Sequence, residues 1–316
     1  MPQKPDFKAC MPNKNALPRR MKELVERAAK LPPVSVAVVD AAEKHVILGA
    51  CEAKHAGLID PVLIGPRSEI EQIMMEEGLD LDTYPIIDAK SEGEAAEVGV
   101  QKILEGQAAA LMKGWIHTDV LLHPVLTHLR TTRRVSHIFV VELASYPKLL
   151  LVTDAAINIA PDLMTKAEIV QNAVDLAMLF GIERPKVAAL SAVEEIKPAI
   201  GSTIDAACLS KMAERGQIRH AVVDGPLAFD NAISKEAALT KKIDSDVSGD
   251  VDILLVPDLT SGNILAKDLE YLAAATMGGI VVGAKVPIML PSRSDPPSAR
   301  LVSAAIAVLV HHQWKT

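Results

Sequence analysis

Apolar residues along the chain fall in short, uninterrupted runs that are separated by longer amphipathic stretches. The runs predict strands at residues 34–39, 62–65, 108–112, 135–141, 149–153, 187–191, 221–224, 253–257, 280–282 and 287–290. Most runs are apolar throughout, which is typical of strands covered on both faces. The amphipathic stretches predict helices at residues 20–30, 41–56, 94–105, 166–180, 204–215, 265–276 and 298–312. The alternation predicts an α/β protein with mainly parallel sheets.

The length of 316 residues favours two domains, because single hydrophobic cores stop growing near about 250–300 residues. The turn-forming Ser145-Tyr146-Pro147 predicts one boundary, and the Leu290-Pro291 segment predicts a second. If the last helix packs against the N-terminal lobe, the first domain consists of residues 1–147 and 291–316. The second domain is then residues 148–290, and we expect the active-site cleft between the two.

Composition excludes several classes of protein. The 33 Lys and Arg against 40 Asp and Glu give a net charge of −7, and the basic residues are scattered, which argues against a nucleic-acid partner. Neither the three cysteines nor the histidines have the spacing of a metal site, and no dinucleotide or P-loop glycine motif is present. No apolar run reaches the roughly 20 residues that span a bilayer, so we predict a cytoplasmic protein without membrane contact.

The segment from Leu290 to Pro297 joins a predicted strand to a predicted helix and has two interpretations. Ser294 or Asp295 can cap the helix, with Pro296 at its first position, and this is the commoner reason for such a pattern. A helix N-terminus beside the guanidinium of Arg293 is also a strong site for a phosphate dianion. The two roles are compatible.

Three arginines, Arg130, Arg133 and Arg134, precede the strand predicted at residues 135–141. A basic run of this kind is usually a solvated surface. Because crowded guanidinium groups repel one another unless an anion is present, a phosphate site is the rival interpretation.

Polar loops are expected after three apolar strands. Asp154 and Asn158 follow the strand at residues 149–153, the segment 224–231 follows another, and Gly262 and Asn263 follow the strand at 253–257. Such residues can simply form turns. In open α/β sheets, loops beyond the carboxyl ends of strands also line the ligand crevice. We therefore predict that these loops line a ligand site.

Seven ordered motifs resemble those of the phosphate acetyl/butyryltransferase family, the phosphotransacetylases and phosphotransbutyrylases, from about Pro33 onward. They are MKGWIHTD (112–119), RTTRRVSHIF (130–139), VTDAAINIAPD (152–162), PKVAALSAVE (185–194), VVDGPLAFDNA (222–232), ILLVPDLTSGNIL (253–265) and VPIMLPSRSD (286–295). The resemblance implies reversible transfer of a short acyl group between CoA and inorganic phosphate, without a metal, a tightly bound cofactor or a covalent intermediate. It also implies a homodimer with a two-domain α/β/α sandwich like that of isocitrate and isopropylmalate dehydrogenases.

The resemblance also implies roles for individual residues. The family's Ser-Arg pair matches Ser292 and Arg293: the hydroxyl would orient the sulfur of CoA, and the guanidinium would hold the phosphoryl group. Arg133 matches the family's upstream phosphate-contacting arginine, with Arg134 and Arg130 as competitors. With the substrates that the resemblance implies, Asp154 and Asn158 are expected to contact phosphate or substrate, and Gly262 and Asn263 are expected to contact CoA. A CoA thiol has a pKa of about 8.5, so a base must remove its proton.

Two positions depart from the acetyl-type pattern. Ala299 stands where the acetyl-type enzymes have their catalytic aspartate, and His123 stands where they often have arginine. Asp295 is then the nearest carboxylate, and either it or another group, including water, takes the proton. Two other functions stay open: a non-catalytic acyl-CoA-binding protein, and an NAD- or metal-dependent dehydrogenase on the same fold. The sequence leaves the acyl chain, acetyl, propionyl or butyryl, undetermined.

Overall fold

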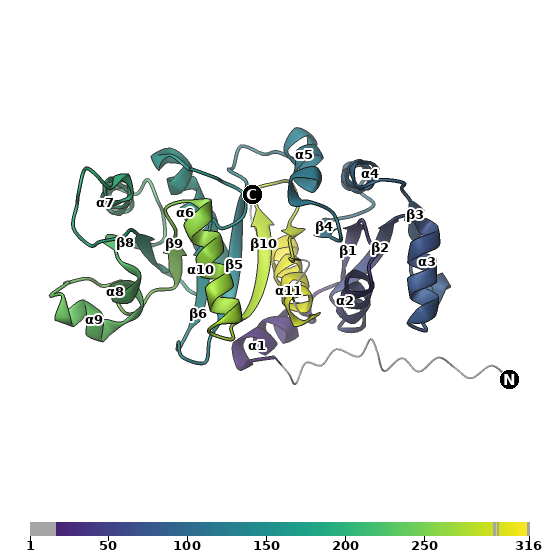
Figure 1. The fold of residues 1–316 in the computed structure, drawn as a ribbon, viewed down its shortest axis with the longest axis horizontal. Coiled ribbons are helices and arrows are strands. Elements are labelled where there is room, and N and C mark those ends of the chain that lie inside the picture. Colours follow the sequence, from purple (N-terminus) through teal and green to yellow (C-terminus); the bar gives the residue numbers. More distant parts are fainter. Residues whose placement is uncertain (1–16, 293–294, 296, 315–316) are drawn as a thin grey trace. The chain divides into compact units, whose positions relative to one another are not determined.

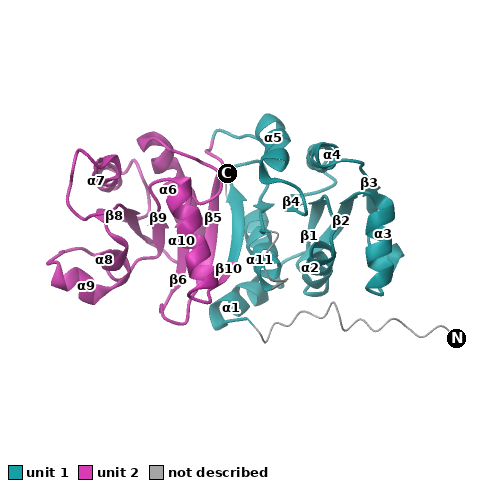
Figure 2. Ribbon diagram, in the orientation of Figure 1, with its two compact units in different colours: residues 1–132, 278–316 teal, residues 133–277 magenta. Residues whose placement is uncertain are grey.

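Strands and helices alternate along the chain in the computed structural model, which describes residues 17–292, 295 and 297–314 (Figure 1). All but two of the described strand pairings are parallel, the exceptions being β10 with β11 and β5 with β6. The predicted α/β class with mainly parallel sheets is therefore confirmed. The chain divides into two compact units, and the first contains both ends of the chain (Figure 2).

Unit 1 comprises residues 1–132 and 278–316. Its strands lie in the order β3-β2-β1-β4-β11-β10, where β10 begins just before the unit boundary. Its elements are α1 (Arg19–Ala28), β1 (Val34–Val39), α2 (Lys44–His55), β2 (Ile59–Gly65), α3 (Arg67–Glu76), η3 (Leu81–Thr83), β3 (Ile86–Asp88), α4 (Glu92–Leu104), β4 (Ala110–Lys113), α5 (Thr118–His128), β10 (Thr276–Val282), β11 (Ile288–Met289) and α11 (Pro297–Gln313). Helix α11 packs against α1 and α2, and its residues Leu301 to Val310 are buried.

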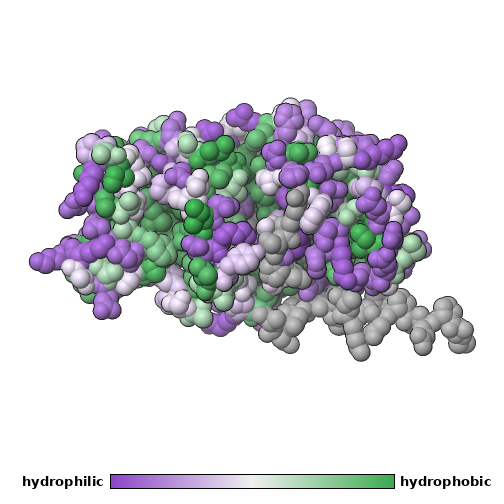
Figure 3. Space-filling model, viewed as in Figure 1, coloured by the Kyte–Doolittle hydropathy of each residue, from purple (hydrophilic) through white to green (hydrophobic). Residues whose placement is uncertain are grey.

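Unit 2 comprises residues 133–277, with strands in the order β5-β6-β9-β7-β8. Its elements are β5 (Ser136–Glu142), β6 (Leu149–Thr153), α6 (Leu163–Leu179), β7 (Lys186–Leu190), α7 (Gly201–Glu214), β8 (Val222–Leu227), α8 (Phe229–Ile233), α9 (Lys235–Thr240), β9 (Ile253–Leu255) and α10 (Leu259–Tyr271). Aliphatic side chains from β5, β6, β7, β9 and α10 form one core cluster. Apolar surface, coloured green, lies over α10 in Figure 3. Ile264 on this helix is 56% exposed, and Leu272, which follows the helix, is 84% exposed.

The bounds of the two compact units differ from those of the two predicted domains. The pairing of the strands explains the difference. Ser145-Tyr146-Pro147 joins β5 to β6, whose antiparallel ladder includes Val141 opposite Leu150, so this turn lies inside unit 2. The hydroxyl of Tyr146 donates to the carbonyl of Val251 at 2.7 Å and fixes the turn there. Leu290 and Pro291 follow β11, which pairs with β4, and they lie inside unit 1.

Two of the expected loops are in fact regular elements. The segment 224–231 contains the second half of β8 and the start of α8. The segment 257–263 contains the first turn of α10, which begins at Leu259 after the N-cap Asp258. The sequence pattern also misses β3, α3, α5, α8 and α9. Within the described residues, the helices are too short or too polar to cross a bilayer.

Candidate active site

The turn that follows β11 holds two of the predicted site residues together. Strand β11 runs parallel to β4, with Met289 opposite Met112, so this turn leaves the same edge of the unit 1 sheet as the loop after β4. The amide of Ser292 donates to Oδ2 of Asp295 at 2.7 Å, and the amide of Asp295 donates to the carbonyl of Ser292 at 3.2 Å. Each residue therefore fixes the other.

Three positions of this segment, Arg293, Ser294 and Pro296, lie outside the described residues. Helix α11 begins at Pro297, two residues after Asp295. The carboxylate of Asp295 accepts the amide of Ser292, which precedes it in the chain. This contact links the residue that follows β11 by three positions to the residue that precedes α11 by two positions.

Arg300, which the sequence analysis did not single out, lies beneath this turn. Its side chain is 2% exposed, and it donates from Nη1 to the carbonyl of Asp295 at 3.0 Å and from Nη2 to the carbonyl of Ser292 at 3.4 Å. Burial lowers the pKa of Arg300 from its ordinary value, while the carboxylates of Asp295 and Glu43 oppose that shift. A single arginine within the apolar stretch from Ala299 to Val310 is the sequence signal that could have found it.

The loop after β4 depends on a glycine. A Cβ on Gly114 would lie 2.1 Å from the carbonyl oxygen of Asp40, so only glycine permits the close approach of this loop to the end of β1. The amides of Gly114 and Trp115 donate to the carbonyls of Val39 and Asp40, both at 2.8 Å. The first part of the MKGWIHTD motif therefore joins the carboxyl ends of β1 and β4.

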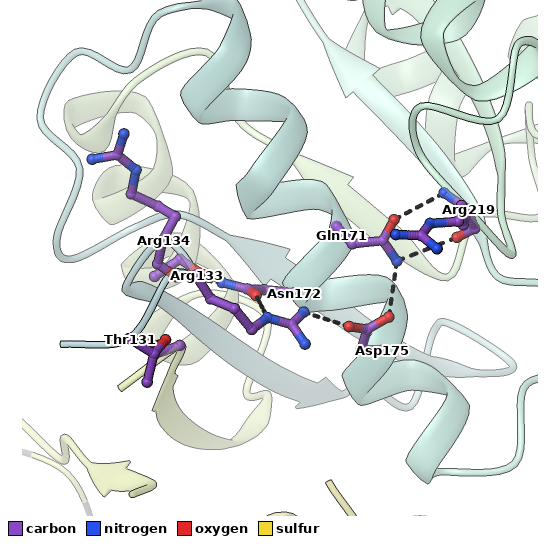
Figure 4. A network of polar contacts seen from close by, with 9 residues as sticks. Thr131, Arg133, Arg134, Gln171, Asn172, Asp175 and Arg219 are labelled. Atoms are coloured by element: carbon purple, nitrogen blue, oxygen red, sulfur yellow. Dashed lines mark hydrogen bonds and ion pairs between the residues drawn. The ribbon is translucent and has the colours of Figure 1, made fainter. Parts of the chain in front are cut away.

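Arg133 lies in unit 2 and is bound to helix α6 (Figure 4). Its Nε donates to Oδ1 of Asn172 at 3.2 Å, and its Nη2 forms an ion pair with the carboxylate of Asp175. Asp175 also accepts from Nε2 of Gln171 at 2.8 Å, and Gln171 accepts the amide of Arg219 at 2.8 Å. The arginine that the resemblance assigns to phosphate therefore has a carboxylate partner in this structure.

The two competing arginines have different surroundings. Arg134 forms an ion pair at 3.2 Å with Glu168, which also lies on α6, and the labelled side chains in Figure 4 show it pointing away from Asn172 and Asp175. Arg130 is exposed, and its backbone forms an isolated antiparallel bridge with Ala284 in unit 1. No described contact distinguishes either of them as a phosphate ligand.

Asp154 and Asn158 build the loop that follows β6. Asp154 is 2% exposed, and its carboxylate accepts the amides of Ala156, Ile157 and Asn158 at 3.0, 3.1 and 3.3 Å. The side-chain amide of Asn158 donates to Asp154 at 2.6 Å and to the carbonyl of Val135 at 3.0 Å. Burial raises the pKa of Asp154, and the hydrogen bonds to its carboxylate oppose this shift. These are the turn contacts that the sequence analysis offered as the alternative to substrate binding.

Gly262 and Asn263 lie in the first turns of α10 and meet this same loop. A Cβ on Gly262 would lie 2.6 Å from the side chain of Val256 and 3.1 Å from Cα of Ala155, so glycine allows the helix to approach. The side-chain amide of Asn263 lies 3.5 Å from the carbonyl of Ala155. The structure thus brings together the four residues predicted on separate loops of unit 2: Asp154, Asn158, Gly262 and Asn263.

His137, in the RTTRRVSHIF motif, is a fully buried residue of β5. Among the described residues, neither of its ring nitrogens has a hydrogen-bond partner, and its ring packs edge-on against Phe139 with centroids 4.3 Å apart. Burial lowers the pKa of His137 from 6.5 to about 3. The imidazole is therefore neutral in the folded protein at neutral pH.

This buried imidazole predicts a loss of stability in acid. Below about pH 6.5 the unfolded chain takes up a proton at His137 that the folded chain does not bind until about pH 3, so folding weakens as the pH falls through that window. Relative to a His137→Leu variant, wild type is expected to lose about 1.4 kcal/mol of unfolding free energy per pH unit there. Urea unfolding at several pH values measures this difference, and parallel profiles for the two proteins would contradict it.

Comparison with known proteins identifies the family. The family model described as "Phosphate acetyl/butaryl transferase" matches residues 89–308, more than half of the chain. The chain belongs to this family, as its motifs predict.

The similar proteins include both phosphate acetyltransferases and phosphate butyryltransferases. A phosphate acetyltransferase of Rickettsia prowazekii is 50% identical over 296 residues, which cover 92% of this chain and 84% of the relative. A phosphate butyryltransferase of Clostridium acetobutylicum is 40% identical over 291 residues, covering 91% and 97%. Among solved structures, a branched-chain phosphotransacylase from Enterococcus faecalis is 33% identical with a TM-score of 0.76, and the match covers 88% of this chain and 99% of that one.

Proposed function

We propose that this protein transfers a short acyl group, acetyl or butyryl, reversibly between CoA and inorganic phosphate, with acyl phosphate as the other product. Membership of the family supports the reaction. One observation supports the assignment of the reaction to particular residues. In the turn after β11, Ser292, the serine of the family's Ser-Arg pair, is hydrogen-bonded to Asp295. CoA and phosphate act as substrates, and the chemistry requires neither a metal nor a bound cofactor.

In the direction that forms acyl-CoA, Asp295 accepts the proton of the CoA thiol, and the hydroxyl of Ser292 orients the sulfur. The sulfur attacks the carbonyl carbon of the acyl phosphate and forms a C–S bond. The tetrahedral centre then collapses, its bond to the bridging oxygen breaks, and inorganic phosphate leaves. Arg293, which lies outside the described residues, is proposed to offset the charge on the phosphoryl group. Positioning and electrostatics supply the rate enhancement in this scheme.

Ser292→Ala is expected to lower kcat about 10- to 100-fold, because a hydrogen bond to a charged group is worth about 1.5–3 kcal/mol. The hydrogen bonds that join Ser292 to Asp295 and Arg300 use the amide and carbonyl of Ser292, and alanine retains both groups. The thermal unfolding temperature should therefore stay at the wild-type value. Steady-state kinetics with acyl-CoA and phosphate measure the effect, and an unchanged kcat would remove the hydroxyl from the mechanism.

Arg133 is proposed as the principal phosphate-contacting arginine, followed by Arg134 and Arg130. Arg133→Ala is expected to raise the KM for phosphate about tenfold and the KM for acyl-CoA less, because it removes a charge-assisted hydrogen bond. Arg134→Ala is the matched control, since Arg134 also pairs with a carboxylate of α6. Equal effects of the two substitutions on the KM for phosphate would contradict the assignment.

The loop formed by Asp154 and Asn158 and the first turns of α10 are proposed to contact the substrates. Backbone and side-chain groups of Asn158 and Asp154 would face phosphate or substrate, and Gly262 and Asn263 would contact CoA. Their proximity within unit 2 supports a shared role. The exposed apolar side chains of α10, together with the family resemblance, support a homodimer, which sedimentation equilibrium would test. A cytoplasmic location stays a prediction.

The experiment that tests the function follows release of free thiol from acetyl-, propionyl-, butyryl- and isobutyryl-CoA in the presence of phosphate or arsenate. We expect phosphate-dependent release with at least one of these substrates. A difference of one methylene is worth about 1–3 kcal/mol of discrimination, so the rates should differ enough to identify the acyl chain. Tight CoA binding without release from any of them would instead select a non-catalytic acyl-CoA-binding protein.

A further inference from the structure

Arg300 combines deep burial with contacts that end on the proposed catalytic turn. It belongs to the first turns of α11, and it donates hydrogen bonds to the carbonyl oxygens of Ser292 and Asp295. Within the part of the chain that the structure describes, its Nε has no hydrogen-bond partner, although burying a guanidinium without full compensation is costly. The stability of the fold alone therefore does not explain an arginine at this position.

Helix α2 is shaped to accept this arginine. A Cβ on Gly49 would lie 2.5 Å from Cδ and 3.3 Å from Cβ of Arg300. Because glycine has no side chain, the side chain of Arg300 has room to pack against the backbone of α2 at this position. Glu43, the N-cap of α2, adds an electrostatic interaction that favours the charged guanidinium. Two positions of the same helix, Gly49 and its N-cap Glu43, therefore accommodate the side chain of Arg300 and its charge.

We propose that Arg300 is a positioning residue for the transfer reaction, which holds the carbonyls of Ser292 and Asp295 so that the serine hydroxyl and the carboxylate keep their mutual geometry. The inference rests on the proposed function. Arg300 does not touch the substrates in this account. It acts through the backbone of the turn, where a displacement of about 1 Å can cost about 100-fold in rate.

The first test separates kcat from KM. Arg300→Met, which keeps an unbranched side chain of similar length, is expected to lower kcat about 10- to 100-fold while the KM values for acyl-CoA and phosphate change less than about threefold. Arg300→Lys keeps a charged donor and should recover part of the lost kcat. A folded Arg300→Met variant with wild-type kcat would overturn the proposal, and so would a loss confined to KM.

A second variant disturbs Arg300 without replacing it. Gly49→Ala puts a methyl group against Cδ of Arg300, whereas Gly93→Ala, in helix α4, meets nothing within 4 Å and is the control. Gly49→Ala should lower kcat about tenfold, and Gly93→Ala should leave it unchanged. In an Arg300→Met background, Gly49→Ala should add little, because both changes act through one contact. Equal kcat values for the two glycine variants would contradict the proposal even if Arg300→Met does not fold.

Hydrogen exchange tests the positioning role of Arg300 independently of the proposed acyltransferase activity. The amide of Ser292 is bonded to Asp295, so Arg300→Met should exchange this amide at least about tenfold faster than wild type, with Gly93→Ala unchanged. If the wild-type protein shows no acyl transfer, the proposed function fails, yet faster exchange would still support the bracing of the turn. Unchanged protection of the Ser292 amide would overturn the inference whether or not the protein is active.

Discussion

Asp295→Asn is expected to lower kcat at least about 100-fold while the protein stays folded. Removal of a general base typically costs about 10²–10⁴-fold, and an asparagine cannot take the proton of the CoA thiol. Its side-chain oxygen can still accept the amide of Ser292, which Asp295 accepts at 2.7 Å, so the turn should persist. The rates of acyl-phosphate consumption with CoA, measured from pH 6 to 9, test this expectation.

The pH profile distinguishes the base from a purely structural residue. If Asp295 takes the proton, the variant should regain rate as rising pH ionises the thiol, whose pKa is about 8.5. A rate that is reduced equally at every pH would assign Asp295 to the shape of the turn. Unchanged turnover would assign the proton to water or another group.

Asp154→Ala is expected to cause a large loss of stability, about 3–5 kcal/mol of unfolding free energy. The substitution leaves three backbone amides and the side chain of Asn158 without their acceptor in a buried loop, and each such group costs about 1–3 kcal/mol. Urea unfolding monitored by circular dichroism measures the loss.

Asp258→Ala is the matched control for this loss. Asp258 caps α10 and accepts a single backbone amide, that of Ser261 at 2.9 Å, so its removal should cost only about 1 kcal/mol. A loss for Asp154→Ala no larger than that for Asp258→Ala would contradict the account of the loop after β6.

The sheet strands were predictable because short, uninterrupted apolar runs mark them, and the missed elements each lack a clear apolar pattern. Helix α3 buries only Ile70 and Met74, so it has almost no apolar stripe. Strand β3 has three residues and pairs on one side with β2. Helix α5 contains Pro124, a residue that argues against a helix interior. The compact units begin and end at other residues than the predicted domains, because a Pro-containing turn cannot reveal which strands pair across it.

Only the contacts between residues close in the sequence could be predicted for the candidate site. The proximity of Ser292 and Asp295 follows from their three-residue separation, and the structure adds the hydrogen bond. The ion pair of Arg133 with Asp175 joins residues 42 apart, and no local pattern encodes it. Arg300 was missed because its role depends on Gly49, which lies on another helix. Buried polar contacts of this kind are set by tertiary packing.

The proposed reaction of this protein is acyl transfer to phosphate and not hydrolysis of acyl-CoA. Phosphorus-31 NMR of a mixture of enzyme, acyl-CoA and inorganic phosphate tests it directly. We expect a new acyl phosphate resonance that grows in step with the release of free CoA and disappears when CoA is added in excess. Release of CoA without an acyl phosphate resonance, or no reaction with any short acyl-CoA, would contradict it.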